Sequence, residues 1–429
     1  MKKLLMALAI AVICSYSFGQ MPPVKTDSLQ AKTDTLRKDA LNVFMDASSY
    51  IKKEIPFINY VRDIKVADLY IITTYEGTGS GGMKVTFFFV GQNKFSGMRD
   101  TLSFSATPDD TEETNRIKQV HTLKLGLMRY VAKTPLSSFL NIAFTQPLSE
   151  TISTDKWKSW VFSANIYGYA NGQKSDKLLS VNGGISAGKV TKDWKINFDA
   201  SYYRRKETFI TDSIGTEYVN TTDEKYLNAL IVRSINDHWS YGGSATLGGS
   251  SFSNYTLTTR LMPGIEYDLF PYSQSTRKQL RLLYKIGPGY NIYNDTTDYL
   301  KTRQFFWSHS LMAAYQVIEK WGTINFSMTY SNYLFDWSKN NLGSNLYLEL
   351  RLAKGLRLYI GGGASIIHDQ INLPKQGASL ADVLTRRREL ESSYQYYVSF
   401  GFSYTFGSIY NNVVNPRFGG GGGGYVMYY

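Results

Sequence analysis

The sequence is poor in cysteine and histidine, two side chains that often carry nucleophilic or metal chemistry. It has one cysteine, Cys14, and four histidines in 429 residues. Cys14 lies in an apolar N-terminal stretch, so a chain processed after that stretch has no thiol for a disulfide, a nucleophile or a metal ligand. The four histidines are scattered along the chain, which does not make a metal site. We therefore expect neither a metal nor a cofactor.

Long apolar runs and basic clusters are also missing. After the N-terminus, no run reaches the roughly 18 apolar residues of a membrane helix, which excludes a helical membrane protein. The formal net charge is +12. However, lysine and arginine are spread singly over the chain, without the basic helix or aromatic-basic cluster that indicates nucleic-acid binding. We therefore expect no nucleic-acid partner.

The N-terminus predicts secretion. Met1-Lys2-Lys3 precedes an apolar core that ends at Cys14, which is typical of a signal peptide, here residues 1–19. A lipid anchor on the cysteine is disfavoured, because Ile13 stands where a lipoprotein signal has a small residue. The polar residues 20–40 predict a flexible leader.

What the sequence has in abundance is alternation of apolar and polar residues. Segments of about ten residues repeat it from 157 to 406, for example Ile196–Tyr202 and Leu346–Leu352. A period of two puts successive side chains on opposite faces of a strand. Aromatic residues make up 15% of the chain, with 33 tyrosines, which fits the tyrosine and tryptophan girdles of membrane interfaces. We therefore predict that residues 157–406 form a transmembrane antiparallel β-barrel, in a mainly β protein.

The barrel pattern contains twelve candidate strands, and the links between them alternate in length. Links such as 191–193 and 319–320 are short, whereas 294–301, 337–341 and 369–389 are longer and polar. Outer-membrane barrels have short periplasmic turns, longer outer loops and an even number of strands. Tryptophans at or next to three of the short turns predict an interfacial girdle at the periplasmic rim: they are Trp194, Trp239 and Trp321.

Residues 41–133 predict a small α/β domain in front of the barrel. Apolar strands are expected over 41–45, 66–75, 83–90 and 100–105, with a short helix after Ser48-Ser49 and an amphipathic helix that Thr111 caps. The glycine-rich loop between the second and third strands indicates a hairpin rather than a phosphate site, because a strand follows it and not a helix. Since the domain precedes the barrel on the short-turn side, we expect it in the periplasm, joined by a connector over 134–156.

The last predicted strand resembles the C-terminal sorting signal of outer-membrane barrels. Gly401, Phe402, Tyr404 and Phe406 supply the glycine and the alternate bulky residues that the barrel assembly machinery reads. Unlike that signal, the strand is not terminal, because a glycine-rich tail, residues 407–429, follows it. The expected partners are thus the assembly machinery, outer-membrane lipid and lipopolysaccharide.

The whole layout resembles an uncharacterised family of outer-membrane barrel proteins of the Bacteroidetes type. The resemblance rests on residues 54–63, 123–131 and 406–418 and spans most of the chain. It implies the outer membrane and this architecture, and it implies no activity. The order of elements in the small domain also looks like that of periplasmic domains that dock partner proteins, so an envelope protein is a further expected partner.

With the apolar face towards lipid, the lumen receives mixed charges. The candidate lumen residues are Arg260, Glu266, Arg281, Lys285, Glu349, Arg351 and Arg357. Twelve strands enclose a narrow interior, so these charges either close it as a salt-bridge network or line a small-solute pore with a cationic bias. We predict a non-enzymatic protein, either a narrow channel or an anchor whose periplasmic domain binds an envelope partner.

The alternative is an outer-membrane lipid hydrolase of the phospholipase or deacylase type. His238 and Ser240 have the spacing that puts both side chains on one face of a strand, as in barrel phospholipases. They stand beside a short turn, however, at the rim opposite the leaflet where those enzymes work. An interfacial histidine without a catalytic role is therefore the favoured interpretation.

Overall fold

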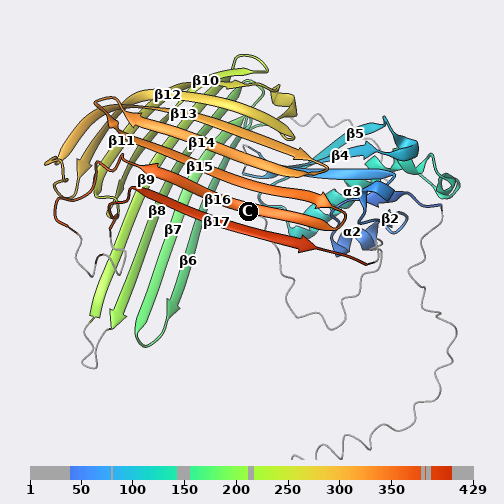
Figure 1. Ribbon diagram of the computed structural model, residues 1–429, viewed down its shortest axis with the longest axis horizontal. Coiled ribbons are helices and arrows are strands. Elements are labelled where there is room, and N and C mark those ends of the chain that lie inside the picture. The colour runs from blue at the N-terminus through green and yellow to red at the C-terminus, as the bar shows by residue number, and fades with distance from the viewer. Residues whose placement is uncertain are drawn as a thin grey trace, which may run out of the picture.

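The computed structural model describes residues 39–78, 81–142, 155–210, 217–377, 382 and 388–407. The predicted signal peptide, nearly all of the leader, most of the connector and the tail beyond Gly407 lie outside these residues. The fold is mainly β, as predicted, with a small α/β domain followed by a large antiparallel sheet (Figure 1). Of the described helices, none is long and apolar enough to cross a membrane.

The small domain is built on a five-stranded sheet with the order β2-β1-β3-β4-β5. β1 pairs in parallel with β2 and β3, whereas β3, β4 and β5 are antiparallel neighbours. Two α-helices and three short 3-10 helices complete it. The bounds are β1 (Asn42–Phe44), α2 (Ser49–Glu54), β2 (Asn59–Tyr60), η1 (Ile64–Val66), β3 (Leu69–Gly77), β4 (Met83–Gly91), η2 (Asn93–Phe95), β5 (Arg99–Ala106), α3 (Glu112–Val131) and η3 (Pro135–Phe139). The two-residue β2 is the one strand here that the sequence pattern does not predict.

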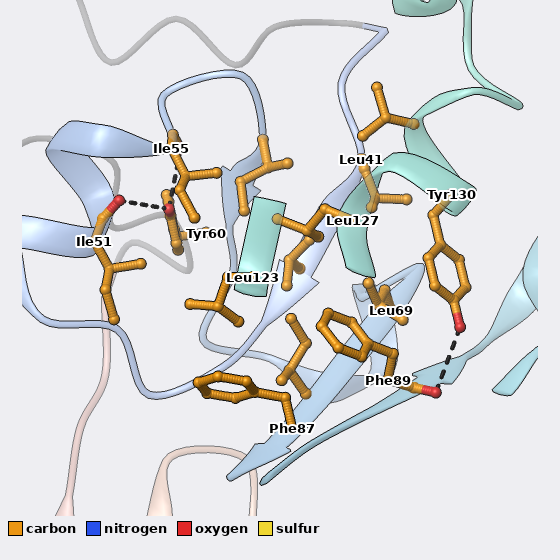
Figure 2. Packing of buried hydrophobic residues seen from close by; sticks show 14 of the residues in the cluster. Leu41, Ile51, Ile55, Tyr60, Leu69, Phe87, Phe89, Leu123, Leu127 and Tyr130 are labelled. Atoms are coloured by element: carbon orange, nitrogen blue, oxygen red, sulfur yellow. Dashed lines mark hydrogen bonds between the residues drawn. The ribbon is translucent and has the colours of Figure 1, made fainter. Parts of the chain in front are cut away.

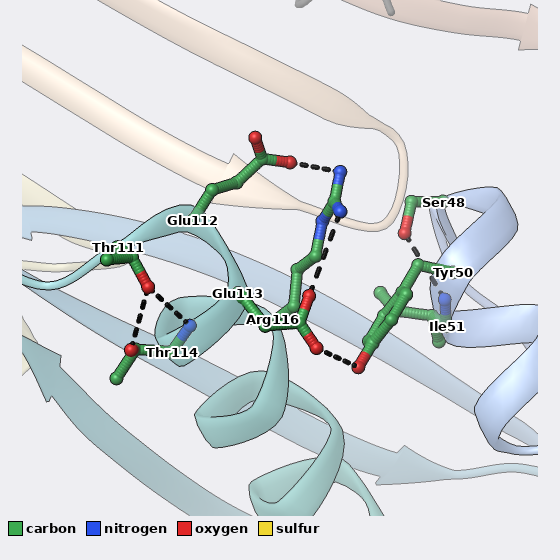
Figure 3. A network of polar contacts seen from close by, with 8 residues as sticks. All are labelled: Ser48, Tyr50, Ile51, Thr111, Glu112, Glu113, Thr114 and Arg116. Atoms are coloured by element: carbon green, nitrogen blue, oxygen red, sulfur yellow. Dashed lines mark hydrogen bonds and ion pairs between the residues drawn. The ribbon is translucent and has the colours of Figure 1, made fainter.

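Side-chain caps fix where the two helices begin (Figure 3). The Ser48 hydroxyl accepts from the Ile51 N–H at 3.3 Å, and the Thr111 hydroxyl accepts from the Thr114 N–H at 3.2 Å. Each cap satisfies an N–H that the helix itself leaves without a partner. The Tyr50 hydroxyl of α2 then donates to Glu113 of α3 at 3.3 Å, so the two helix starts lie side by side.

The domain has a hydrophobic core of its own between the sheet and the helices (Figure 2). Leu69, Phe87, Phe89, Leu123 and Leu127 are fully buried. Burying one such side chain stabilises a fold by about 1.5–3 kcal/mol. This core makes the small domain a structural unit distinct from the large sheet.

The large sheet contains twelve strands, each paired antiparallel with the next along the chain. In Figure 1 the strand direction turns steadily from β6 to β17, so the sheet curves round. The described residues show no pairing between β6 and β17. The bounds are β6 (Trp160–Gly172), β7 (Asp176–Val190), β8 (Trp194–Ile210), β9 (Glu217–Ser234), β10 (Trp239–Ser250), β11 (Tyr255–Asp268), β12 (Lys278–Tyr293), β13 (Arg303–Glu319), β14 (Gly322–Tyr333), β15 (Asp336–Ala353), β16 (Leu356–Ile367) and β17 (Tyr394–Tyr404).

The sheet has two ends with different connections. We call "turn end" the end with the links 191–193, 235–238, 269–277, 320–321 and 354–355. We call "loop end" the end with the links 251–254, 294–302 and 368–393. The expected link 337–341 at the loop end is wrong, because β15 begins at Asp336 and pairs through Asn340 with Asn332 of β14. The Asn332 side chain donates to the Trp337 carbonyl at 3.0 Å, so this polar run is held as strand.

The register separates an apolar face from a polar face. One row across β6 to β11 reads Phe162, Ala187, Phe198, Ala229, Ala245 and Leu261. On the opposite face, Arg260 of β11 donates to the Tyr333 hydroxyl of β14 at 3.2 Å, although two strands lie between them. Only the concave side brings such side chains together, so the polar face lines the lumen.

Candidate functional site

Among the described residues, two ion pairs of the lumen join neighbouring strands, and a third, between Arg205 and Glu207, lies within β8. Arg281 of β12 lies 3.5 Å from Glu266 of β11, and Arg357 of β16 lies 3.6 Å from Glu349 of β15. The Tyr272 hydroxyl, in the β11–β12 link, adds a 3.0 Å hydrogen bond to Glu266. These pairs stay within their own part of the sheet and do not bridge the lumen from side to side.

Arg260 is held by aromatic rings rather than by a carboxylate. Its guanidinium lies 5.1 Å from the ring centre of Phe306 and 5.8 Å from that of Tyr333, the range of a cation–π contact. Of the seven predicted lumen residues, five are cations and two are carboxylates. Of these seven residues, Arg260, Lys285 and Arg351 take no part in the two ion pairs.

The described first part of the β16–β17 link, residues 368–377, folds back across the loop end of the lumen. Ile371, 1% exposed, packs on Phe306 and Tyr333. The two residues that follow it, Asn372 and Leu373, are also buried. We call residues 369–374 the plug segment. An apolar side chain seated on the aromatic pair beside Arg260 excludes water from this part of the lumen.

Hydrogen bonds fasten the plug segment to two other links at the loop end. The Asn372 side chain donates to the Ser253 carbonyl at 3.1 Å and to Glu389 at 2.8 Å, and the Asn372 backbone carbonyl accepts from the Asn254 side chain at 2.7 Å. The Asp298 N–H donates to the Leu373 carbonyl at 3.0 Å. Asn254 has a φ of +59°, a left-handed conformation that asparagine tolerates better than most residues. The plug is thus built into the fold.

The turn end of the sheet contacts the small domain. The Lys354 Nζ lies 3.1 Å from Asp63 Oδ2. The guanidinium of Arg351 lies 4.5 Å from the centre of the Phe44 ring, and that of Arg277 lies 5.1 Å from the centre of the Phe88 ring. The register of β15 puts Arg351 on the lumen face near the turn end. Because the Phe44 ring contacts Arg351, Phe44 lies at the turn end of the lumen.

Asp63 is the acidic partner in this contact, and its surroundings favour the charged form. The Lys65 backbone N–H donates to its carboxylate at 3.0 Å, and this bond is the largest cause of a lowered pKa. Burial raises the pKa, by less than this bond lowers it, and the hydrogen bond and charge of Lys354 lower the pKa further. Asp63 is therefore ionised at neutral pH and is set to hold Lys354.

The other predicted positions fall at the ends of strands. Trp194 and Trp239 begin β8 and β10, and Trp321 precedes β14, so all three stand at the turn end with about two fifths of each side chain exposed. In the last strand, Phe402 and Tyr404 lie on the apolar face of β17, Gly401 lies on the other, and Phe406 follows the strand. The three bulky side chains are exposed.

His238 and Ser240 have different partners. The His238 Nδ1 lies 2.8 Å from the Asp268 carbonyl oxygen, and its ring stacks on Tyr267. The Ser240 hydroxyl lies 3.0 Å from the Tyr272 hydroxyl, on the lumen side. In this arrangement the histidine does not contact the serine as a catalytic base would.

The sequence predicts the charges of the lumen face, but it predicts neither the plug segment nor the contacts of the small domain. Alternation along each strand predicts the face of a residue, and the register puts Arg260, Glu266 and Arg351 on the polar face. The plug segment and the Phe44 and Asp63 contacts join segments far apart in the chain. The one local signal for the plug is the density of asparagine in the loop-end links, which is common to many turns.

The described site can now be compared with known proteins. Residues 174–387 match the family model described as "Protein of unknown function, DUF481". The match covers just under half of the chain and runs from the β6–β7 turn into the β16–β17 link. It adds no activity, because the family is described only as having an unknown function.

A solved structure gives a second similarity. It is titled "NanC porin structure in rhombohedral crystal form", with 11% sequence identity, 57% of this chain and 99% of that chain covered, and a TM-score of 0.27. A likeness at this level does not transfer a function. No curated protein matches the chain.

Proposed function

We propose that this protein is an outer-membrane β-barrel that closes its own lumen and holds its small domain at the periplasmic rim as a docking module for an envelope protein. The observation that carries the proposal is the pair of closures, by the plug segment at the loop end and by the small-domain contacts at the turn end. A barrel closed in this way serves better as an anchor than as an open pore.

The apolar face supports a location in the outer membrane. Strands of 11 to 18 residues are as long as or longer than the roughly 9–11 residues that a tilted strand needs to cross the hydrocarbon layer. Large apolar residues are exposed along this face, for example Leu261, Leu282 and Leu311, and lipid would cover them. The predicted signal peptide and the assembly signal of β17 belong to the same proposal.

The anchor role is tested by co-purification from native outer membranes. The full chain is compared with a variant lacking residues 41–133, after both are shown to insert as folded barrels. We expect a defined envelope protein to accompany the full chain and to be lost with the deletion. Recovery of the same protein with both forms would contradict the docking role.

A narrow solute channel is the second candidate, because Arg260, Lys285 and Arg351 lie on the lumen face and take no part in the two ion pairs. The plug then acts as its gate. In planar bilayers we expect the full chain to conduct little. Asn372→Ala is expected to raise conductance, because it removes the two hydrogen bonds that the Asn372 side chain donates. Asn171→Ala, at the exposed end of β6, is the control. A large steady conductance of the unaltered protein would reject the closed lumen.

The proposed function is non-enzymatic. We expect the purified protein to hydrolyse neither phospholipid nor lipopolysaccharide. The variants His238→Ala and Ser240→Ala should therefore show the same absence of lipid hydrolysis as the unaltered protein. Lipid hydrolysis that both changes abolish would instead establish the hydrolase.

A further inference from the structure

A groove runs over the apolar face of β6 to β12. It is made by an alternation of large and small side chains, in which Ala187 lies between Phe162 and Phe198, followed by Ala229 and Ala245. Two overlapping hollows of about 1060 Å³ and 640 Å³ result. Each is comparable with the roughly 300–1,000 Å³ of a small-molecule site. Both are lined almost wholly by apolar side chains and backbone.

Cations gather on the same face at the loop end of this groove. Lys177, Arg204, Lys206 and Lys225 all have the register of the apolar face, on three adjacent strands. Arg204 pairs with Asp223, Lys206 pairs with Thr221, and Lys225 pairs with Tyr202. Lys225 also lines the smaller hollow. The cationic cluster and the groove are therefore one continuous surface.

Two carboxylates share this face, and they do not balance the cations. Asp223 lies 3.7 Å from Arg204 and accepts from the Tyr202 hydroxyl at 2.9 Å. Glu217 pairs with Ile210 at the end of β9. Asp223 is thus already bonded within the sheet, which leaves Lys206 and Lys225, both exposed, with their charged ends towards the surroundings.

We propose that this surface binds a phosphorylated, multiply acylated glycolipid of the lipid A type, with acyl chains in the groove and phosphate on Lys206 and Lys225. The inference rests on the proposed outer-membrane function, which turns the loop end towards the outer leaflet. Lysine and arginine bind phosphate through charge-assisted hydrogen bonds, and an apolar groove gives acyl chains a defined seat.

The charge pattern favours this lipid over a second copy of the chain. A second copy would bring the same cations to the same end, where like charges repel. A lipid with phosphate at one end and hydrocarbon at the other matches a surface that is cationic at one end and apolar beyond it. Phospholipid has fewer phosphates and chains, so it would use only part of the site.

The test uses native mass spectrometry of the full chain in detergent, with lipid A, dephosphorylated lipid A and phosphatidylglycerol as probes. Losing a hydrogen bond to a charged group weakens binding by about tenfold or more. We expect Lys206→Gln with Lys225→Gln to weaken lipid A binding by at least that factor and to leave the dephosphorylated lipid unaffected. Ala229→Phe, which fills the groove, is expected to weaken both.

Lys189→Gln is the matched control, because Lys189 lies on the same face of β7 at the turn end. Three outcomes would each overturn the proposal. They are unchanged lipid A binding by the double variant, an equal loss of lipid A binding in the Lys189→Gln control, and phosphatidylglycerol binding as tight as lipid A binding. A dimer that buries Ala229 and excludes lipid would do the same. Heat-modifiable gel migration confirms folding of each variant. If the double variant folds poorly, Lys225→Arg is compared with Lys225→Gln, because arginine keeps the positive charge and glutamine removes it. Failure of the unaltered protein to insert into bilayers would count against the outer-membrane function instead.

Discussion

At the scale of single residues, close packing decides positions that helix propensity would decide differently. Gly126 lies in the middle of α3, where alanine would normally be preferred by about 1 kcal/mol. A Cβ at this position would stand 2.1 Å from the ring of Phe89, which is itself fully buried. Glycine is therefore used here because the helix approaches β4 too closely for any side chain.

Gly126→Ala is accordingly expected to destabilise the small domain. Overpacking a core of this kind costs about 1–3 kcal/mol. Hydrogen exchange of the α3 amides in the full chain measures it, with Leu125→Ala as the control, since Leu125 is 56% exposed. Slower exchange of the α3 amides in Gly126→Ala than in the unaltered protein would contradict the packing argument.

The lumen residues show which properties of a single residue can be predicted from the sequence. Alternation predicts that Arg260 and Glu266 share the lumen face, because register depends on position along one strand. It does not predict that Arg260 binds between Phe306 and Tyr333, since these rings come from strands two and three places away. The face is local information, and the partner depends on how the whole sheet curves.

At the scale of elements, the docking of the small domain depends on one turn and a few rings. The β15–β16 turn presents Lys354 to Asp63, whereas Arg351 and Arg277 meet aromatic rings that no pH change affects. Lys354 is well exposed, so its ion pair contributes only about 0.2–1 kcal/mol. The contacts that hold the small domain to the sheet are therefore mainly cation–π, with a small contribution from the ion pair.

That contribution has a definite pH dependence. Asp63 has a lowered pKa in the folded protein, so its contribution is complete above the unfolded value of about 3.9 and is lost as the pH falls through the folded value. We expect Lys354→Met to lower the melting temperature of the small domain at pH 7. The same change should have no effect at a pH below the folded-state pKa of Asp63, where the carboxyl group is neutral. The helical circular dichroism signal reports the melting. An equal difference at both pH values would remove the ion pair as its cause.

The elements themselves were largely predictable. Period-two alternation located the twelve strands, and the caps at Ser48 and Thr111 located the two α-helices. The sequence pattern does not predict strands whose residues are mostly polar, such as Trp337–Asn341. At the loop ends of the strands no apolar face is needed, so the alternation is lost there. The pattern also fails to predict β2, whose two residues carry no periodicity.

At the scale of the whole molecule, the two edge strands pose the main physical question. β6 and β17 are exposed along almost their whole length, and among the described residues they have one neighbour strand each. An unpaired backbone N–H or C=O costs several kcal/mol in hydrocarbon, so an open sheet edge does not persist in a bilayer. The directions allow closure, because the first and last of twelve antiparallel strands run in opposite directions.

We therefore expect β6 and β17 to pair when the protein is in a membrane, and the scarcity of cysteine makes this directly testable. Asn165 of β6 and Tyr397 of β17 both have the lumen register. With Cys14 changed to serine, Asn165→Cys is combined in turn with Gln395→Cys, Tyr397→Cys and Ser399→Cys, which covers neighbouring registers. A disulfide requires Cα atoms within about 4.4–6.8 Å, so at least one pair should cross-link in bilayers and none in urea. If no pair cross-links in the bilayer, the edges remain apart and the lumen opens sideways to lipid.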